Sequence, residues 1–261
     1  MPRFAANLSF LFPEVPFLDR FAAAARAGFR AVEYLFPYEF APDELARRLQ
    51  DYGLGQVLFN LPPGNWDAGE RGLGALPGRE AAFAAGVEQA LSYAHLLNCR
   101  QIHALAGVLP DGVARSDAEA VYIRNLRYAA ALLKPHGIRL LIEPINNVRD
   151  IPGYFLNTAA QAQRIIAAVG SDNLFLQMDL YHCQIMSGDL AENIRQHFGS
   201  ISHFQIAGNP GRHEPDVGEV YYPYLFDLID SLGYTGWIGC EYRPQGQTTA
   251  GLGWARAYGI G

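Results

Sequence analysis

The chain has 261 residues, is 50% hydrophobic and carries a formal net charge of −6, a size and composition that fit one α/β barrel domain covering residues 1–261. The acidic balance, without a basic stripe, argues against a nucleic-acid partner, and no stretch reaches the roughly 20 apolar residues that a bilayer span needs. Three cysteines without paired spacing, and a start without a signal-peptide pattern, predict a reducing, cytoplasmic environment.

Strand-like and helix-like segments alternate along the whole chain, a pattern typical of a parallel sheet covered by helices. The expected strands are short, contain β-branched or aromatic residues, and are bounded by Gly, Pro or Asn. In chain order they are Phe4–Asn7, Ala31–Tyr34, Gln56–Asn60, Gln101–Ala104, Ile138–Glu143, Leu174–Asp179, Ile201–Gln205 and Trp237–Glu241.

Helical periodicity fills the segments between these strands and is clearest in Arg79–Leu97, where apolar residues form one stripe. Ser116 followed by Glu119 has the spacing of a capping box, which predicts a helix from Asp117 to about Lys134. The other expected helices are Phe17–Ala27, Pro42–Tyr52, Thr158–Ala168, Asp189–Phe198 and Tyr224–Leu232. Eight strand-helix units without a break in composition predict a single closed (β/α)₈ TIM barrel.

Two connections, Leu61–Gly78 and Ala207–Tyr222, are longer than most loops and follow the ends of expected strands. Loops after barrel strands lie over the active face. Leu61–Trp66 is therefore expected to form part of a lid, with Trp66 as a wall of the site. An irregular surface excursion is the equally open alternative.

Glu143, Asp179, Gln205 and Glu241 end the last four expected strands, where barrel enzymes place their chemistry. Side chains alternate along a strand, so these groups are expected to converge in the barrel mouth. Three carboxylates brought together repel one another, and no lysine or arginine on those strand ends matches them. Their hard oxygens suit Mg²⁺ or Mn²⁺. Any one of these residues alone would be explained by capping its strand or by a local pair. Four of them at equivalent ends of successive strands predict a metal site.

A cationic pair, His182 and Arg212, follows these strands and is expected to hold an anionic substrate, because a guanidinium matches a carboxylate. A role for His182 in orienting a metal ligand is a nearly equal alternative. Arg212 reads equally as a solvated loop cation or a partner of Glu214. A histidine in the position of His103 is more often a packed or hydrogen-bonded core residue than a catalytic one.

Polar residues on the second and third strands and in the lid loop complete the expected lining. Glu33 and Asn60 end their strands and are expected to orient other groups or to make structural hydrogen bonds. Glu70 and Arg71 form either an exposed ion pair or, for the arginine, a cation that closes over an acid group.

Seven sequence runs that carry these residues resemble the hydroxypyruvate isomerase family, within the xylose isomerase-like barrel superfamily. The resemblance extends from the first strand to the C-terminus, and the runs are specific only when taken together. They are Asn60–Pro62, Gly69–Gly72, Ile142–Asn146, Asp179–His182, His203–Ala207, Pro210–Pro215 and Gly239–Tyr242.

The resemblance implies interconversion of hydroxypyruvate and tartronate semialdehyde through an enediolate, with Glu143 and Glu241 exchanging protons with the substrate. It also implies a divalent metal, Mg²⁺ or Mn²⁺, held by Glu143, Asp179, Gln205 and Glu241. Many epimerases of the superfamily have a histidine where this chain has Gln205, whose neutral amide oxygen is a weaker ligand. The expected substrate contacts are His182, Arg212, Asn60, Glu70, Arg71 and His103.

Four alternatives to this activity stay open from the sequence. Two lie in the same superfamily: a 2-oxo-tetronate isomerase and a ketose 3-epimerase. A DNA-repair endonuclease of the multi-zinc type needs more ligating histidines and a basic face than this chain has. A non-catalytic binder of small acids is the fourth. The number of subunits also stays open, a homo-oligomer included.

Overall fold

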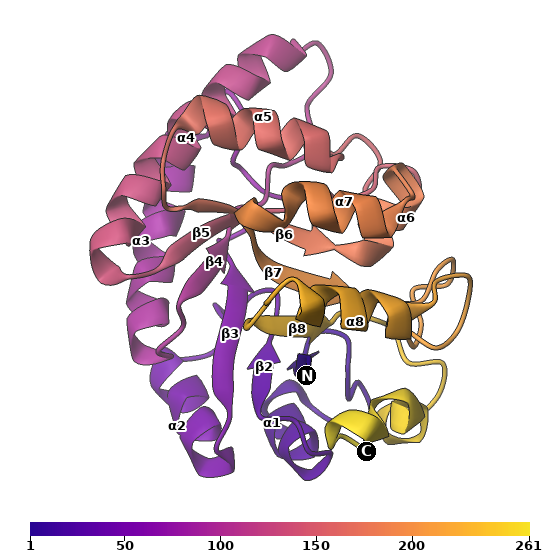
Figure 1. Ribbon diagram of the computed structural model, residues 1–261. Coiled ribbons are helices and arrows are strands. Elements are labelled where there is room, and N and C mark those ends of the chain that lie inside the picture. Colours follow the sequence, from indigo (N-terminus) through magenta and orange to yellow (C-terminus); the bar gives the residue numbers. More distant parts are fainter.

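The computed structural model describes residues 1–261 and forms a parallel eight-stranded barrel that closes by pairing β1 with β8 (Figure 1). The eight strands are β1 Arg3–Asn7, β2 Ala31–Glu33, β3 Gly55–Asn60, β4 Gln101–His103, β5 Arg139–Ile142, β6 Leu174–Asp179, β7 Ile201–Ile206 and β8 Trp237–Cys240. All eight expected strands are confirmed to within one residue at each end, and so is the single (β/α)₈ barrel.

The helices lie outside the barrel and cover its strands (Figure 1). Their apolar faces and the outward side of the strands form the main hydrophobic core. Gly53 and Gly170 end α2 and α5 in the left-handed conformation, which a glycine adopts without strain. The helices are α1 Phe17–Arg26, α2 Pro42–Tyr52, α3 Glu80–Leu96, α4 Arg115–Leu133, α5 Ala159–Val169, α6 Leu180–Met186, α7 Leu190–His197 and α8 Tyr222–Ser231, with short 3₁₀ segments η1 Lys134–His136, η2 Phe198–Ser200 and η3 Thr248–Tyr258.

The interior of the barrel changes from apolar to polar along the strands. A small buried cluster that includes Ala5, Ala31 and Leu141 fills its base. Two residues further along β1 and β2, on the same face, stand the buried side chains of Asn7 and Glu33. The polar side chains of the site therefore rest on a packed apolar floor.

One local expectation about a helix end was wrong, and one helix was missed. Helix α4 begins at Arg115 after Ala114, and neither Ser116 nor Glu119 makes the hydrogen bonds of a capping box. The Arg115 side chain instead donates to the Phe155 carbonyl at 2.8 Å, a tertiary contact that anchors the first turn. Helix α6 was not expected at all, and it begins directly where β6 ends, at Asp179.

The C-terminal segment η3, yellow in Figure 1, packs beside α8 and the start of the barrel. The Trp254 ring meets the edge of Phe4 from β1 with 5.0 Å between ring centroids. The Gly261 amide donates to the Ala27 carbonyl at the end of α1 at 2.9 Å. The last turn thus covers the junction of the first and last strands. None of the helices combines the length and apolar character needed to cross a membrane.

Candidate active site

A cleft of about 260 Å³ opens at the carboxyl ends of the strands, where the sequence places the site. It contains three carboxylates, one histidine and three arginines, bounded by apolar side chains and Trp66. The two long loops contribute Trp66 and Arg212 to its lining, and closure of the first loop as a lid stays a prediction. The lining residues are Phe10, Leu35, Asn60, Trp66, Arg71, Leu105, Glu143, Ile145, Asp150, Ile151, His182, Arg212, Glu241 and Arg243.

Glu143 and Asp179 each place near the cleft one buried carboxylate oxygen that accepts no hydrogen bond. Asp179 is the N-cap of α6: its Oδ1 accepts from the Tyr181 amide at 2.7 Å and the His182 amide at 3.3 Å. Its Oδ2 has no hydrogen-bond partner, and neither does Oε1 of Glu143. Glu143 Oε2 accepts from Gln177 at 3.0 Å. A buried carboxylate oxygen without a donor is costly, so these two oxygens point to a cationic partner.

The His182 ring lies beside both oxygens, with Nε2 3.7 Å from Glu143 Oε1 and 3.8 Å from Asp179 Oδ2. Its Nδ1 is 2.7 Å from the Asn146 amide nitrogen. The oxygen of that amide accepts from the backbone of Arg149 and Asp150, which fixes its nitrogen toward the histidine. The Nδ1 atom therefore accepts a hydrogen bond, and a neutral His182 carries its hydrogen on Nε2. Burial lowers the pKa of His182 to about 4.

One atom each from Glu143, Asp179 and His182 lie within 4.8 Å of one another, a grouping consistent with a divalent metal. The two free carboxylate oxygens are hard donors of the kind that Mg²⁺ and Mn²⁺ bind. The residues present therefore fit the predicted class of metal. Two of the four expected ligands, Glu143 and Asp179, belong to this cluster.

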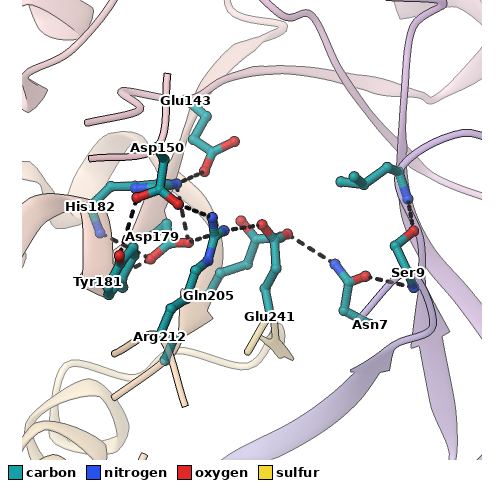
Figure 2. A network of polar contacts seen from close by, with 12 residues as sticks. Asn7, Ser9, Glu143, Asp150, Asp179, Tyr181, His182, Gln205, Arg212 and Glu241 are labelled. Carbon is teal, nitrogen blue, oxygen red and sulfur yellow. Dashed lines mark hydrogen bonds and ion pairs between the residues drawn. The ribbon is translucent and has the colours of Figure 1, made fainter. Parts of the chain in front are cut away.

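Glu241, the third expected carboxylate ligand, is fully engaged with protein donors (Figure 2). Its Oε1 accepts from Arg212 at 2.5 Å, and its Oε2 accepts from Asn7 at 2.9 Å and from Gln205 at 2.6 Å. Burial raises the pKa of Glu241 to about 8, and the Arg212 guanidinium opposes this rise. Burial, followed by the charges of Glu241 and Asp179, raises the pKa of Glu143 well above its ordinary value.

Arg212 lies among three carboxylates at the centre of the network in Figure 2, and its Nη2 is 3.9 Å from Asp179 Oδ2, beyond hydrogen-bond distance. It donates to Asp150 Oδ1 at 2.8 Å and to Glu241, and it does not pair with Glu214. Burial alone would lower the pKa of this arginine, but the surrounding carboxylates, Glu241 first among them, raise it above its ordinary value. The structure thus makes Arg212 an internal counter-ion, where the sequence also allowed a solvated cation.

Gln205 makes contacts different from those that its predicted role as an oxygen ligand requires. Its amide nitrogen donates to Glu33 at 2.8 Å and to Glu241, while its oxygen accepts from Gln177 at 2.6 Å. The amide nitrogen of Gln205 must face the carboxylates of Glu33 and Glu241, because the amide oxygen would be repelled by their negative charge. Gln205 is therefore placed as a hydrogen-bond donor to Glu241.

Glu33 anchors this network from the second strand. It accepts from Asn7 at 3.0 Å, Gln205 at 2.8 Å and His203 at 2.7 Å. His203 and Gln205, two residues apart on β7, thus both point into the barrel toward Glu33. The space above Gly239 is occupied by the Glu33 carboxylate, and a side chain at that glycine would collide with it. Glu33 thus orients two of the donors that hold Glu241.

His103 lies below the cleft and does not line it. Its Nδ1 is 3.1 Å from Asn60 Oδ1 and 3.6 Å from Glu143 Oε2. Burial, followed by the charge of His203, lowers the pKa of His103 to about 3. The His103 ring is packed under Asn60, which does line the cleft, and its contact with substrate stays a prediction.

His103 predicts a measurable response to acid. The unfolded chain binds a proton at this histidine below about pH 6.5, whereas the folded chain does so only near pH 3. Stability from the neutral ring is complete above pH 6.5 and falls as the pH falls, by about 2 kcal/mol between pH 6.5 and pH 5. We expect the difference in unfolding free energy between the parent and His103→Gln to shrink by this amount in urea titrations at pH 7 and pH 5. An unchanged difference would contradict the neutral, buried ring.

Glu70 also does not reach the cleft, contrary to its expected role in substrate binding. Its carboxylate pairs with Arg79, and it also accepts from the Asn65 amide at 2.5 Å. The hydrogen bond from Arg79 lowers the pKa of Glu70. Of the two alternatives left open for Arg71, the ion pair with Glu70 is not formed. Arg71 instead lines the cleft and stacks on Trp66, with 3.9 Å between its guanidinium carbon and the ring centroid.

Several functional positions were missed from the sequence. Asp150, which holds Arg212 and accepts from Asn146 at 2.6 Å, lies in a loop without any pattern that marks it. Asn7 is the last residue of β1, a position similar to that of Glu143 directly after β5. Its place at a strand end could therefore have marked it as a residue of the site. Gln177 shares a strand face with Asp179, and that alternation predicts its inward direction.

Comparison with known proteins places the chain in a family. The family model described as xylose isomerase-like TIM barrel matches residues 21–258. A 2-oxo-tetronate isomerase of Cupriavidus necator is 56% identical over 258 residues, which is 99% of each chain. The hydroxypyruvate isomerase of Escherichia coli K12 is 48% identical over 99% of this chain and 100% of its own. A Brucella melitensis crystal structure titled AP endonuclease, family 2, is 53% identical, with a TM-score of 0.97 and 99% of each chain covered.

The closed barrel and the carboxylate cluster at its carboxyl end define an enzyme of the TIM-barrel class. The chain belongs to the xylose isomerase-like TIM barrel family. Within that family it is an isomerase: its full-length relatives at 45–56% identity are named 2-oxo-tetronate isomerase or hydroxypyruvate isomerase.

Proposed function

We propose that this isomerase acts on small acids that carry a carbonyl next to a hydroxyl, and that it interconverts hydroxypyruvate and tartronate semialdehyde. The observation that carries the proposal is the pair of buried oxygens of Glu143 and Asp179 that accept no hydrogen bond, next to a cleft that Glu143 and Glu241 line together with three arginines. The carboxylates suit enediolate chemistry, and the arginines suit a substrate with a negative charge.

Glu241 and Glu143 have different surroundings, and each is assigned one of the two proton transfers. Arg212 favours the charged form of Glu241, whereas no arginine or lysine pairs with Glu143. We therefore assign Glu241 as the base that takes the proton from C3 of hydroxypyruvate and Glu143 as the acid that returns one to C2. The hydroxyl proton passes from O3 to O2, so the product has the same composition as the substrate.

His182 and the metal-capable oxygens support the same reaction. The Nε2 hydrogen of a neutral His182 points toward the reacting region and can donate to a substrate oxygen. Glu143 and Asp179 would hold Mg²⁺ or Mn²⁺, whereas Gln205 and Glu241 would first have to release their protein partners to become ligands. When bound, such a cation would supply a Lewis acid that stabilises the negative charge of an enediolate.

A second substrate, 2-oxo-tetronate, is favoured by the 56% identity to a relative named for it. It differs from hydroxypyruvate by one added hydroxymethylene carbon, so the reacting groups and the carboxylate remain the same. A neutral ketose would leave the cationic side of the cleft without a partner. The net charge of −6 and the carboxylates of the cleft are also a poor match to a DNA backbone.

One assay tests the proposal: turnover of hydroxypyruvate, 2-oxo-tetronate and a neutral ketose, each after chelation and after adding back Mg²⁺ or Mn²⁺. We expect turnover of an acid that chelator lowers at least about tenfold and that either cation restores, together with a cation-induced rise in Tm. Preference for the neutral ketose would overturn the substrate class. Full activity after exhaustive chelation would overturn the metal.

A further inference from the structure

The cleft contains three guanidinium groups, and their partners differ. Arg212 has both terminal nitrogens paired with protein carboxylates, at 2.8 Å to Asp150 and 2.5 Å to Glu241. Only its Nε is without a partner. Forming a two-pronged contact with a substrate carboxylate would break one of these buried ion pairs, which is costly. Arg212 is therefore poorly placed to recognise an acid group.

Arg71, in contrast, has no carboxylate partner. Its Nη1 donates to the backbone carbonyls of Trp66 and Glu70, both at 2.8 Å. No protein acceptor contacts its Nη2 or Nε, and the guanidinium lies 3.9 Å from the Trp66 ring centroid. The side chain is half-buried and lines the same cleft as Glu143 and Glu241.

The loop around Arg71 is fastened at both sides. Glu70, the preceding residue, is held by Arg79 and by the Asn65 amide, and a side chain at Gly64 would collide with its carboxylate. Further along the loop, the Gly74 amide donates to the Leu105 carbonyl at 3.1 Å. These contacts fix the backbone that carries Arg71, so little conformational entropy is lost when its guanidinium binds a ligand.

Arg243 is the remaining cation of the cleft. Its side chain is exposed and makes no ion pair or hydrogen bond within the chain. Ordering such a side chain on a ligand costs more than using one that is already stacked and hydrogen-bonded. Among the three arginines, only Arg71 is both free of protein carboxylates and fixed in place.

We propose that Arg71 is the specificity-determining residue that binds the substrate carboxylate, presented by Trp66 and by the Glu70–Arg79 pair. This inference rests on the proposed function, and it names which cation selects acids over neutral sugars. The carboxylate of the substrate lies at the Arg71 side of the cleft, and its carbonyl and hydroxyl carbons lie toward Glu143 and Glu241. A ketose with a hydroxymethyl group in place of the carboxylate lacks this contact.

The test compares Arg71→Ala and Arg71→Lys with Arg243→Ala, and uses Arg124→Ala on the outer surface of α4 as a control. For the preferred acid we expect Arg71→Ala to raise KM about 10- to 100-fold with a smaller change in kcat, since a hydrogen bond to a charged group contributes about 1.5–3 kcal/mol. Arg71→Lys should show a smaller rise in KM than Arg71→Ala, because lysine keeps the positive charge but cannot form the two-pronged contact of a guanidinium. Arg243→Ala should have a smaller effect than Arg71→Ala, and Arg124→Ala none.

Two further readouts separate this inference from the proposed function. Turnover of dihydroxyacetone, which has a hydroxymethyl group where hydroxypyruvate has its carboxylate, should be equally low in the parent and in Arg71→Ala. Glycerate, which has the carboxylate but no carbonyl, should raise the Tm of the parent and not of Arg71→Ala, whether or not the enzyme turns over an acid. An acid KM or a glycerate shift that Arg71→Ala leaves within twofold of the parent overturns the inference. So does a larger loss in Arg243→Ala.

Discussion

Glu241→Gln is expected to lower kcat for the acid substrate by about 10³-fold while the protein stays folded. Glutamine has nearly the same size and retains an oxygen that can accept from Arg212, but it cannot take a proton from carbon. The buried ion pair with Arg212 is lost, and Asp150 continues to hold that arginine at 2.8 Å. Steady-state kinetics, circular dichroism and Tm would be measured on the same preparations.

Two variants make this result specific. Glu88→Gln on α3, an exposed position, should keep parental turnover. Glu241→Asp keeps the charge but moves it back by one methylene, and we expect a loss of about 10²-fold, smaller than that of the amide. Turnover of Glu241→Gln within severalfold of the parent would sink the two-glutamate mechanism.

Asp179→Asn is expected to remove the response to Mg²⁺ or Mn²⁺ without weakening the fold. The two oxygens of Asp179 have different tasks: Oδ1 caps α6 through the Tyr181 and His182 amides, and Oδ2 accepts no hydrogen bond. Asparagine caps helices as well as aspartate does, but it lacks the second anionic oxygen. We expect cation affinity to fall by at least about 100-fold, and turnover to fall with it.

A paired substitution separates the cap from the metal. Asp179→Ala removes both functions and should cost about 1 kcal/mol more in unfolding free energy than Asp179→Asn, measured with chelator present. Asp43→Asn, exposed in the first turn of α2, serves as the control. If Asp179→Asn showed the same cation-induced rise in Tm as the parent, Asp179 would not be a ligand.

Much of the site was predictable because strand ends and side-chain alternation depend on local sequence. Glu143, Asp179, Gln205 and Glu241 were predicted to converge, and contacts such as Gln205 with Glu241 at 2.6 Å bring them together. Their roles were less predictable. The sequence treats Gln205 as an oxygen ligand, whereas the carboxylates of Glu33 and Glu241 select its nitrogen as a donor.

Failures of local reasoning have a common cause. The capping box at Ser116 is a valid pattern, but a contact from Arg115 to Phe155, 40 residues away, anchors the helix earlier. Glu70 pairs with Arg79 instead of its neighbour Arg71, because the loop folds back on the start of α3. A local sequence pattern contains no information about contacts with residues that are distant in the chain.

Alternation of strands and helices, the parity of side chains and the placement of acids at strand ends determined the barrel and the place of its chemistry from the sequence alone. Only the tertiary structure decided which oxygens are engaged and which are free. Arg212 is matched by Asp150, 62 residues away in the chain, while Arg71 keeps no carboxylate of its own. The reason is physical: hydrophobic periodicity is a property of neighbouring residues, but the pairing of buried charges depends on distances across the closed barrel.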